Sequence, residues 1–110
     1  MWTTGHPGLA WEEMTQRICR ERGGFEPDIR HRTNDATVSV ALVARGIAVT
    51  LLPDLVLPEP HAGISLRPMV GEPVMRTILA VTRAADAARP STRAVLATIR
   101  HVAAALPYGE

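Results

Sequence analysis

The first recurrence of apolar residues at helical spacing in this 110-residue chain lies between Leu9 and Arg22. Trp11, Met14 and Ile18 mark the expected buried side of this helix. Glu12 and Glu13 come early in the stretch and three arginines, at positions 17, 20 and 22, come late, as the helix dipole favours. Gly23-Gly24 follows and is expected to end the helix.

A second helix is predicted from Asp35 to Gly46 by its end signals as well as its apolar positions. The Asp35 carboxylate can accept from the free backbone N–H groups of a first turn, so it is expected to cap the helix. Gly46 can take the left-handed conformation that ends a helix. Val38, Leu42 and Val43 recur at helical spacing between them and predict its buried face.

The third helical stretch is near the end of the chain, where Ser91 is the expected N-cap. Its apolar residues fall on one stripe, at Val95, Ile99, Val102 and Leu106. A stripe of this kind is expected to pack against another apolar surface.

Four segments read as strands after the short extended start at residues 1–5. Residues 28–33 alternate and are largely polar, which predicts an edge strand, whereas the apolar, β-branched run 47–52 predicts a strand buried on both faces. Residues 64–69 and 74–83 are expected to pair antiparallel across a turn at 71–73. Helices alternate with strands early and strands adjoin late, so the fold class is α/β with a mixed, mostly parallel sheet flanked by helices.

Turn and loop residues separate these elements. Pro53 is expected to open a short helical turn over residues 54–56, and the proline-rich stretch 58–63 predicts a rigid polar loop. Residues 84–90 are expected to form a loop before the last helix.

Composition and charge nominate no macromolecular partner. The chain has 12 arginines, no lysine and a formal net charge of +1, so no strong field draws it to nucleic acid or to an anionic membrane. Its length allows one domain. No apolar run approaches the roughly 20 residues that span a bilayer, and the N-terminus lacks a secretion pattern, so a cytoplasmic location is the default.

Candidate chemistry is sparse. The four histidines, at positions 6, 31, 61 and 101, show no metal-binding spacing, so no metal site and no cofactor are predicted. Cys19, the one cysteine, lies within the first helix, where burial is its common fate. Neither a nucleophile motif nor a phosphate-binding loop is present, and no enzymatic activity is predicted.

The polar segment Thr33, Asn34 and Asp35 is the exception, because it joins the end of a strand to the start of a helix. Ligands of α/β sheets bind at the carboxyl ends of strands, and helix N-termini favour anions such as a carboxylate. Thr4 and Gly5, before the first helix, have the same setting. The alternative is that these residues only cap their helices.

The sequence resembles the effector-binding domain of LysR-type transcriptional regulators. The resemblance runs from Gly24 to Val56, most specifically at Gly46 and the Leu51-Leu52-Pro53 strand end, and continues through residues 64–69 and 75–83. Ala48 stands where the family usually has a second glycine. The resemblance implies a type II periplasmic-binding-protein fold, with a small-molecule effector held between two lobes.

By this resemblance, residues 2–75 would form the second lobe, and residues 76–106 would supply the return strand and closing helix of the first. Without most of the first lobe the apolar stripe of the last helix would lose its natural partner surface, so we expect a homodimer or a larger assembly. The DNA-binding winged helix-turn-helix would lie outside this chain, which would reach promoter DNA only through it. Thr4, Gly5, Thr33, Asn34 and Asp35 would face the effector. An alternative within the same fold is a solute-binding lobe with no role in transcription.

Overall fold

The computed structural model describes residues 1–57 and 63–107. It divides into two compact units, Met1–Pro73 and the part from Val74 onward. Of the predicted polar loop at 58–63, all but Gly63 lies outside the described residues.

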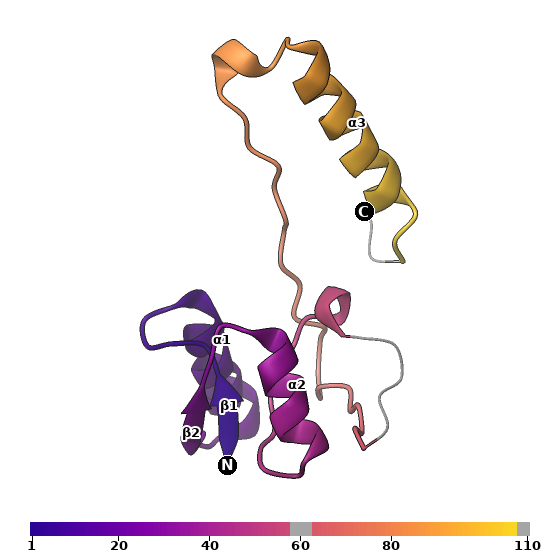
Figure 1. The fold of residues 1–110 in the computed structure, drawn as a ribbon. Helices are drawn as coiled ribbons and strands as arrows, with labels where there is room; N and C mark the ends of the chain where they lie inside the picture. Colours follow the sequence, from indigo (N-terminus) through magenta and orange to yellow (C-terminus); the bar gives the residue numbers. More distant parts are fainter. Residues whose placement is uncertain (58–62, 108–110) are drawn as a thin grey trace. The chain divides into compact units, whose positions relative to one another are not determined.

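The first unit is built on two parallel strands, β1 (Trp2–Thr4) and β2 (Ile29–Arg32) (Figure 1). Side chains of β2 alternate between half-buried and exposed, which confirms the predicted edge strand. Parallel pairing brings the carboxyl ends of both strands to one edge of the sheet. The loops that follow the strands therefore start side by side.

Helix α1 (Ala10–Ile18) follows β1 and continues as one π-helical turn, Cys19–Gly23. Gly24 then adopts a left-handed conformation with a φ of 66° and ends the helix. The predicted helix and its glycine stop are confirmed, with the last turn wider than an α-helix. Ile18 is buried as predicted.

Helix α2 (Ala36–Ala44) has the predicted ends. The Asp35 carboxylate accepts a 2.8 Å hydrogen bond from the Thr37 amide, and Gly46 has a φ of 68°. The predicted buried face is wrong, because Ser39 and Val40 are buried while Val38 is 46% exposed. This helix is apolar nearly all round, so its pattern does not specify which face packs against β1.

The predicted strand at 47–52 is wrong as a regular strand. Only Val49 forms a bridge, parallel to Trp2, with hydrogen bonds from the Thr3 amide to the Val49 carbonyl (3.0 Å) and from the Val49 amide to the Met1 carbonyl (3.2 Å). Ala48 is buried, but Ile47 and Val49 are more than 40% exposed. This extended segment is therefore packed against the protein on one side only, and its other side is exposed to solvent.

Pro53 precedes the 3-10 turn η2 (Asp54–Val56), which confirms the predicted helical turn.

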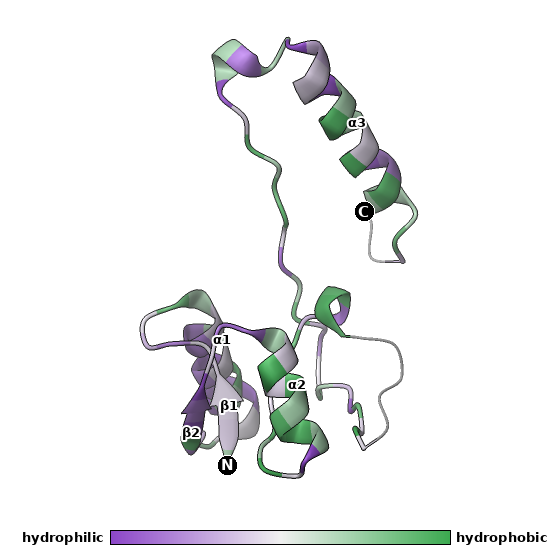
Figure 2. Cartoon of the chain, in the orientation of Figure 1, coloured by the Kyte–Doolittle hydropathy of each residue, from purple (hydrophilic) through white to green (hydrophobic). Residues whose placement is uncertain are grey.

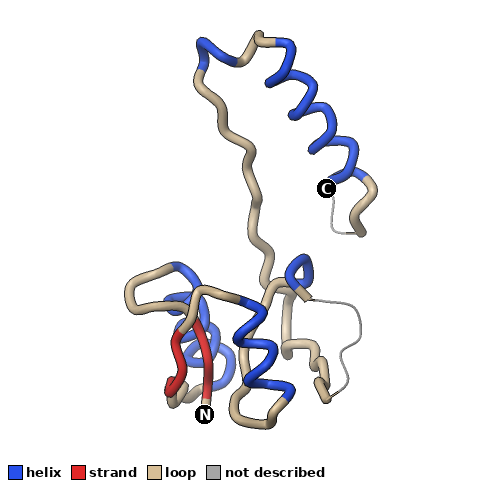
Figure 3. The backbone as a smooth tube through the Cα atoms, in the orientation of Figure 1, coloured by secondary structure: helices blue, strands red, loops and turns tan. Residues whose placement is uncertain are grey.

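The predictions of strands at residues 64–69 and 74–83 are also wrong. Both segments are drawn as loop in Figure 3, and neither contains a strand. Leu66, Ile78 and Val81 are 63%, 65% and 88% exposed. The β-branched composition favours extended chain, but a ladder needs a partner strand to pack against. The sheet within residues 1–57 and 63–107 is therefore parallel, and the predicted mixed sheet is wrong.

The second unit contains the 3-10 turn η3 (Ala84–Asp86), within the predicted loop, and helix α3 (Pro90–Ala104). The predicted Ser91 cap is wrong, since Arg89 is the N-cap and Pro90 takes the first helical position. Proline suits this position because its missing N–H has no intrahelical acceptor there. Apolar positions recur along α3 in Figure 2, and none of its residues is buried.

The buried residues of the described chain all belong to the first unit. The apolar ones are Ile18, Cys19, Val40 and Ala48. A comparable number of buried side chains are polar, namely Thr3, Thr4, Glu12, Thr15 and Ser39. The core is consequently small and rich in hydroxyl groups, and it surrounds β1.

Candidate functional site

The loops after β1 and β2 lie against each other at the carboxyl ends of the strands (Figure 1). The Thr33 amide donates to the Thr4 carbonyl over 2.9 Å. The His6 amide donates to Asn34 Oδ1 over 3.1 Å. The structure thus brings together the five predicted residues, Thr4, Gly5, Thr33, Asn34 and Asp35, in what we call the two-loop site.

Gly5 allows the two loops to approach this closely. It is buried, and a Cβ atom at this position would lie 3.2 Å from Asn34 Oδ1 and 3.2 Å from Trp11 Cβ. Both contacts are tighter than ordinary van der Waals contact, so a side chain here would require Asn34 and Trp11 to shift by a few tenths of an ångström. Glycine therefore suits this close approach of the two loops.

The second loop presents its polar atoms at the surface. Asn34 and Asp35 are exposed, and Thr33 is half-buried with its hydroxyl accepting from the Asp35 amide over 3.0 Å. Asp35 uses one carboxylate oxygen to cap α2. The Asn34 amide oxygen accepts from the His6 amide, and the NH2 group remains as a donor on this exposed side chain.

Thr4 has a different position from the other four residues. It is fully buried, and its hydroxyl lies 3.0 Å from the Thr15 hydroxyl and 3.3 Å from the Trp11 carbonyl. The Thr4 side chain therefore anchors β1 to α1 beneath the loop. Only its backbone, through the bond to the Thr33 amide, takes part in the loop pair.

The sequence analysis did not identify Glu12 as a site residue. Its carboxylate holds the loop after β1 in place through hydrogen bonds. One carboxylate oxygen accepts from the Gly8 amide over 2.9 Å, and the other pairs with the Arg32 guanidinium at the end of β2. The Arg32 hydrogen bond, followed by the Gly8 amide, lowers the pKa of Glu12 below its ordinary value. Its place in the first turn of α1, where acidic side chains meet free backbone N–H groups, is the sequence signal that could have found it.

The remaining candidates are dispersed. His6 lies in the first loop, His31 in β2 and His101 in the last turn of α3, while His61 lies outside the described residues. Cys19 is buried as predicted, and burial raises the pKa of its thiol, which disfavours a reactive thiolate. Among residues 1–57 and 63–107 no three His, Cys, Asp or Glu side chains are grouped to hold a metal ion.

A family model described as the LysR substrate binding domain matches residues 1–104. The chain belongs to this family. The predicted resemblance is confirmed over nearly the whole sequence. No curated protein and no solved structure shows a significant match.

Membership in the LysR substrate-binding domain family implies a fold of the type II periplasmic-binding kind. The described residues form a small α/β structure with a parallel two-stranded sheet and three α-helices. None of the helices described here has the length and apolar character needed to cross a membrane.

Proposed function

We propose that this chain is the ligand-sensing part of a LysR-type transcriptional regulator of the cytoplasm. The observation that carries the proposal is the family match over residues 1–104, since LysR substrate-binding domains belong to regulators and not to enzymes. Promoter DNA would be bound by a winged helix-turn-helix outside this chain. The chain itself would bind a small molecule and carry out no reaction.

The effector would bind at the two-loop site. Gly5, Thr33, Asn34 and Asp35 supply the contact surface in this proposal, and Thr4 holds the first loop in place. The start of α2 favours an anion, while the exposed Asp35 carboxylate favours a hydrogen-bond donor. A small carboxylate that also carries a hydroxyl or amino group satisfies both, with the Asn34 amide as a donor to it.

Sensing requires that the effector bind one arrangement of the regulator better than another, because equal affinity for both shifts nothing. In the proposed organisation residues 2–75 form the second lobe, and residues 76–106 return to the first. The division of the structure after Pro73 supports this assignment. Closure of the lobes on the effector would then change how the attached DNA-binding domains meet the promoter.

A homodimer or larger assembly is part of the proposal. Val95, Ile99 and Val102 are 58%, 47% and 54% exposed along α3, and apolar area of this kind favours association. Light scattering at tens of micromolar chain should give at least a dimer, and Ile99→Glu should shift the chain toward monomer. A monomeric wild-type chain under these conditions would argue against this part.

The proposal is tested by finding the effector. Native mass spectrometry of the purified chain should show a small molecule bound, and calorimetry with hydroxy and amino carboxylates should rank their affinities. Asn34→Ala should weaken the best ligand by about tenfold, since a hydrogen bond to a charged group contributes about 1.5 kcal/mol. Ser65→Ala, an exposed change elsewhere in the first unit, is the matched control and should leave affinity unchanged.

The regulatory part has its own test. The polypeptide that carries this domain together with a DNA-binding domain should change its affinity for its promoter when that effector is added. Binding of the effector without any effect on promoter affinity would support a solute-binding module instead of a regulator.

A further inference from the structure

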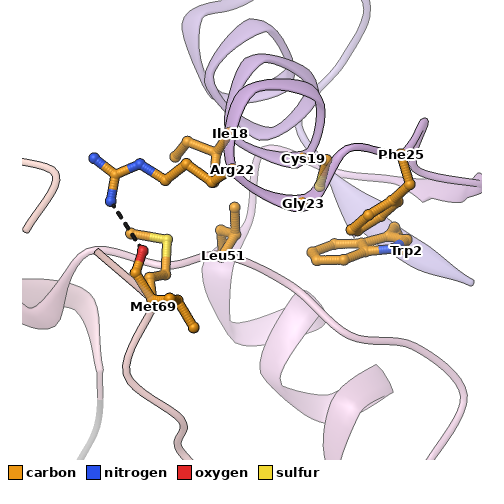
Figure 4. A pocket seen from close by; sticks show the side chains of 9 residues that line it. Trp2, Ile18, Cys19, Arg22, Gly23, Phe25, Leu51 and Met69 are labelled. Carbon is orange, nitrogen blue, oxygen red and sulfur yellow. Dashed lines mark hydrogen bonds between the residues drawn. The ribbon is translucent and has the colours of Figure 1, made fainter. Parts of the chain in front are cut away.

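A hollow lies in the first unit, at the opposite end of β1 from the two-loop site. Trp2, the first residue of β1, lines it, whereas the two-loop site follows Thr4, the last. The hollow has a volume of about 200 Å³ and opens to the surface. We call it the amino-end hollow, and most of its lining is apolar, including Ile18, Cys19, Phe25, Leu51 and Met69 (Figure 4).

One wall is fixed by the π-helical turn and its glycines. The Gly24 amide donates to the Arg20 carbonyl and the Phe25 amide to the Cys19 carbonyl, each over 3.2 Å, so the chain folds back at once. A Cβ on Gly23 would lie 2.4 Å from the Phe25 ring, so only glycine leaves room for the ring there. The wall is therefore formed before any ligand arrives.

The Phe25 ring and Trp2 form the aromatic end of the hollow. Their ring centroids are 6.1 Å apart with a 36° tilt between planes, a separation typical of aromatic pairs. Phe25 is nonetheless 45% exposed. An apolar ring inserted beside the pair would cover surface that water now contacts, which favours binding.

The opposite wall is held by two long-range contacts. The Trp11 indole donates to the Leu51 carbonyl over 2.9 Å, which fixes the backbone at Leu51. The Arg22 guanidinium donates to the Val70 carbonyl at 3.4 Å and to the Glu72 carbonyl, which draws residues 69–72 against the π-helical turn. Segments far apart in the sequence are thus joined around one small space.

Arg22 is the one charged residue among those that line the hollow. Its guanidinium lies at the end away from Trp2 and Phe25 in Figure 4. It has five N–H donors, and the backbone carbonyls use those of a single nitrogen, Nη1. The hollow accordingly has an aromatic end, an apolar middle and a cationic end.

We propose that the amino-end hollow is a second ligand site, which binds a small aromatic monocarboxylate with its ring beside Trp2 and Phe25 and its carboxylate at Arg22. A dry cavity of about 150 Å³ accommodates benzene, so about 200 Å³ suits one ring with a short chain. This site is distinct from the two-loop site and does not depend on the proposed function.

The chain contains two tryptophans, so the indole N–H signals in a proton–nitrogen NMR spectrum report on Trp2 and Trp11 separately. The probe is 3-phenylpropionate, which has one ring, a two-carbon spacer and a carboxylate. Titration into the 110-residue chain should shift the Trp2 signal in a saturable way. A ligand of this size is expected to bind with a dissociation constant on the order of a few millimolar.

Two variants separate this site from nonspecific binding. Phe25→Ala should weaken the probe at least about fivefold by removing the aromatic wall. Leu55→Ala, in the same unit, outside the hollow and similarly exposed at 50%, should leave the affinity unchanged. Arg22→Gln should weaken the probe about threefold, the scale of an exposed charge pair, and remove its advantage over neutral 3-phenylpropanamide.

Several outcomes would overturn the proposal. One is an unchanged chemical shift of the Trp2 indole N–H at probe concentrations well above the expected dissociation constant. Another is equal affinity in the wild-type and Phe25→Ala chains. Shifts of the Thr33, Asn34 and Asp35 amides without a Trp2 shift would place the probe at the two-loop site and also exclude the amino-end hollow. If Phe25→Ala does not fold, the Arg22→Gln chain decides by its ligand preference, because Arg22 also holds residues 69–72 and its loss could lower the affinity for either probe. An undiminished preference for 3-phenylpropionate over 3-phenylpropanamide in this chain would overturn the proposal.

Discussion

Each of the two units of this chain contains a helix with apolar residues on one face, but that face is buried in the first unit and exposed in the second. Ile18 on α1 and Ile99 on α3 both occupy apolar positions at helical spacing, yet Ile18 is 9% exposed and Ile99 is 47% exposed. In the first unit the strand β1 gives α1 a surface to pack on. In the second unit nothing described within that unit covers α3. An amphipathic pattern therefore identifies the face that needs cover, and the topology decides whether it receives any.

The largest expected effect uses the same substitution in both helices. Ile18→Ala should lower the free energy of unfolding by about 3 kcal/mol, because it removes buried carbon atoms and leaves a cavity. Ile99→Ala should change it by less than about 0.5 kcal/mol when the chain is diluted until it is monomeric, because the proposed α3 interface is then not formed. Urea unfolding followed by circular dichroism measures both. Equal losses would show that α3 is packed as tightly as α1.

A second comparison uses two threonines that each donate to the carbonyl four residues earlier. Thr15 bonds the Trp11 carbonyl at 2.9 Å and is fully buried beside Thr4, whereas Thr98 bonds the Ala94 carbonyl at 3.0 Å and is exposed. Thr15→Val should cost about 1–2 kcal/mol, because it deprives the buried Thr4 hydroxyl of a partner.

Thr98→Val is the control for this pair and should be nearly neutral. The double variant Thr4→Val with Thr15→Val should cost less than the sum of the two single changes, since it removes both polar groups together. Additive losses in the unfolding free energies would contradict a direct Thr4–Thr15 interaction.

The helix starts offer a third comparison. Asp35→Ala should destabilise the first unit by about 1 kcal/mol through loss of the cap on α2, and Asp35→Asn should retain most of the stability. Ser91→Ala should have almost no effect, because Ser91 lies inside α3 and makes no capping bond. Thermal unfolding of the three variants checks this. If Ser91→Ala lowered the stability as much as Asp35→Ala, that result would support the predicted Ser91 cap.

The smallest effect is a dependence on pH. Hydrogen bonds from Arg32 and Gly8 lower the pKa of Glu12 in the folded chain, so ionised Glu12 stabilises the fold above its unfolded pKa. That stabilisation should be lost as the pH falls through the folded pKa. Glu12→Gln should flatten the acidic side of the stability curve, measured as urea midpoints at successive pH values. Glu13→Gln, an exposed neighbour, should leave the curve as it is.

Local chemistry made the helix ends predictable from the sequence. The Asp35 cap and the stops at Gly24 and Gly46 depend on neighbouring residues only, and all three are present in the structure. The strands at 64–69 and 74–83 were not predictable in the same way, because a strand exists only with its partner. Their β-branched residues specify extended chain and do not specify what lies beside it.

The two-loop site was partly predictable for the same reason. Parallel strands place their following loops together, so the meeting of Gly5 with Asn34 follows from the order of elements. The contact between Glu12 and Arg32, 20 residues apart, depends on how α1 lies across the sheet. The burial of the Thr4 hydroxyl also depends on how α1 packs on the sheet. This packing cannot be predicted from a local sequence pattern.

The central claim is that the effector binds where the loops after β1 and β2 meet. Its most direct test is a backbone proton–nitrogen NMR titration of the chain with the carboxylate that native mass spectrometry selects. Saturable shifts should concentrate at the amides of His6, Thr33 and Thr37, which bond across or within the two loops. Saturable binding that leaves these three amides unchanged would contradict the claim.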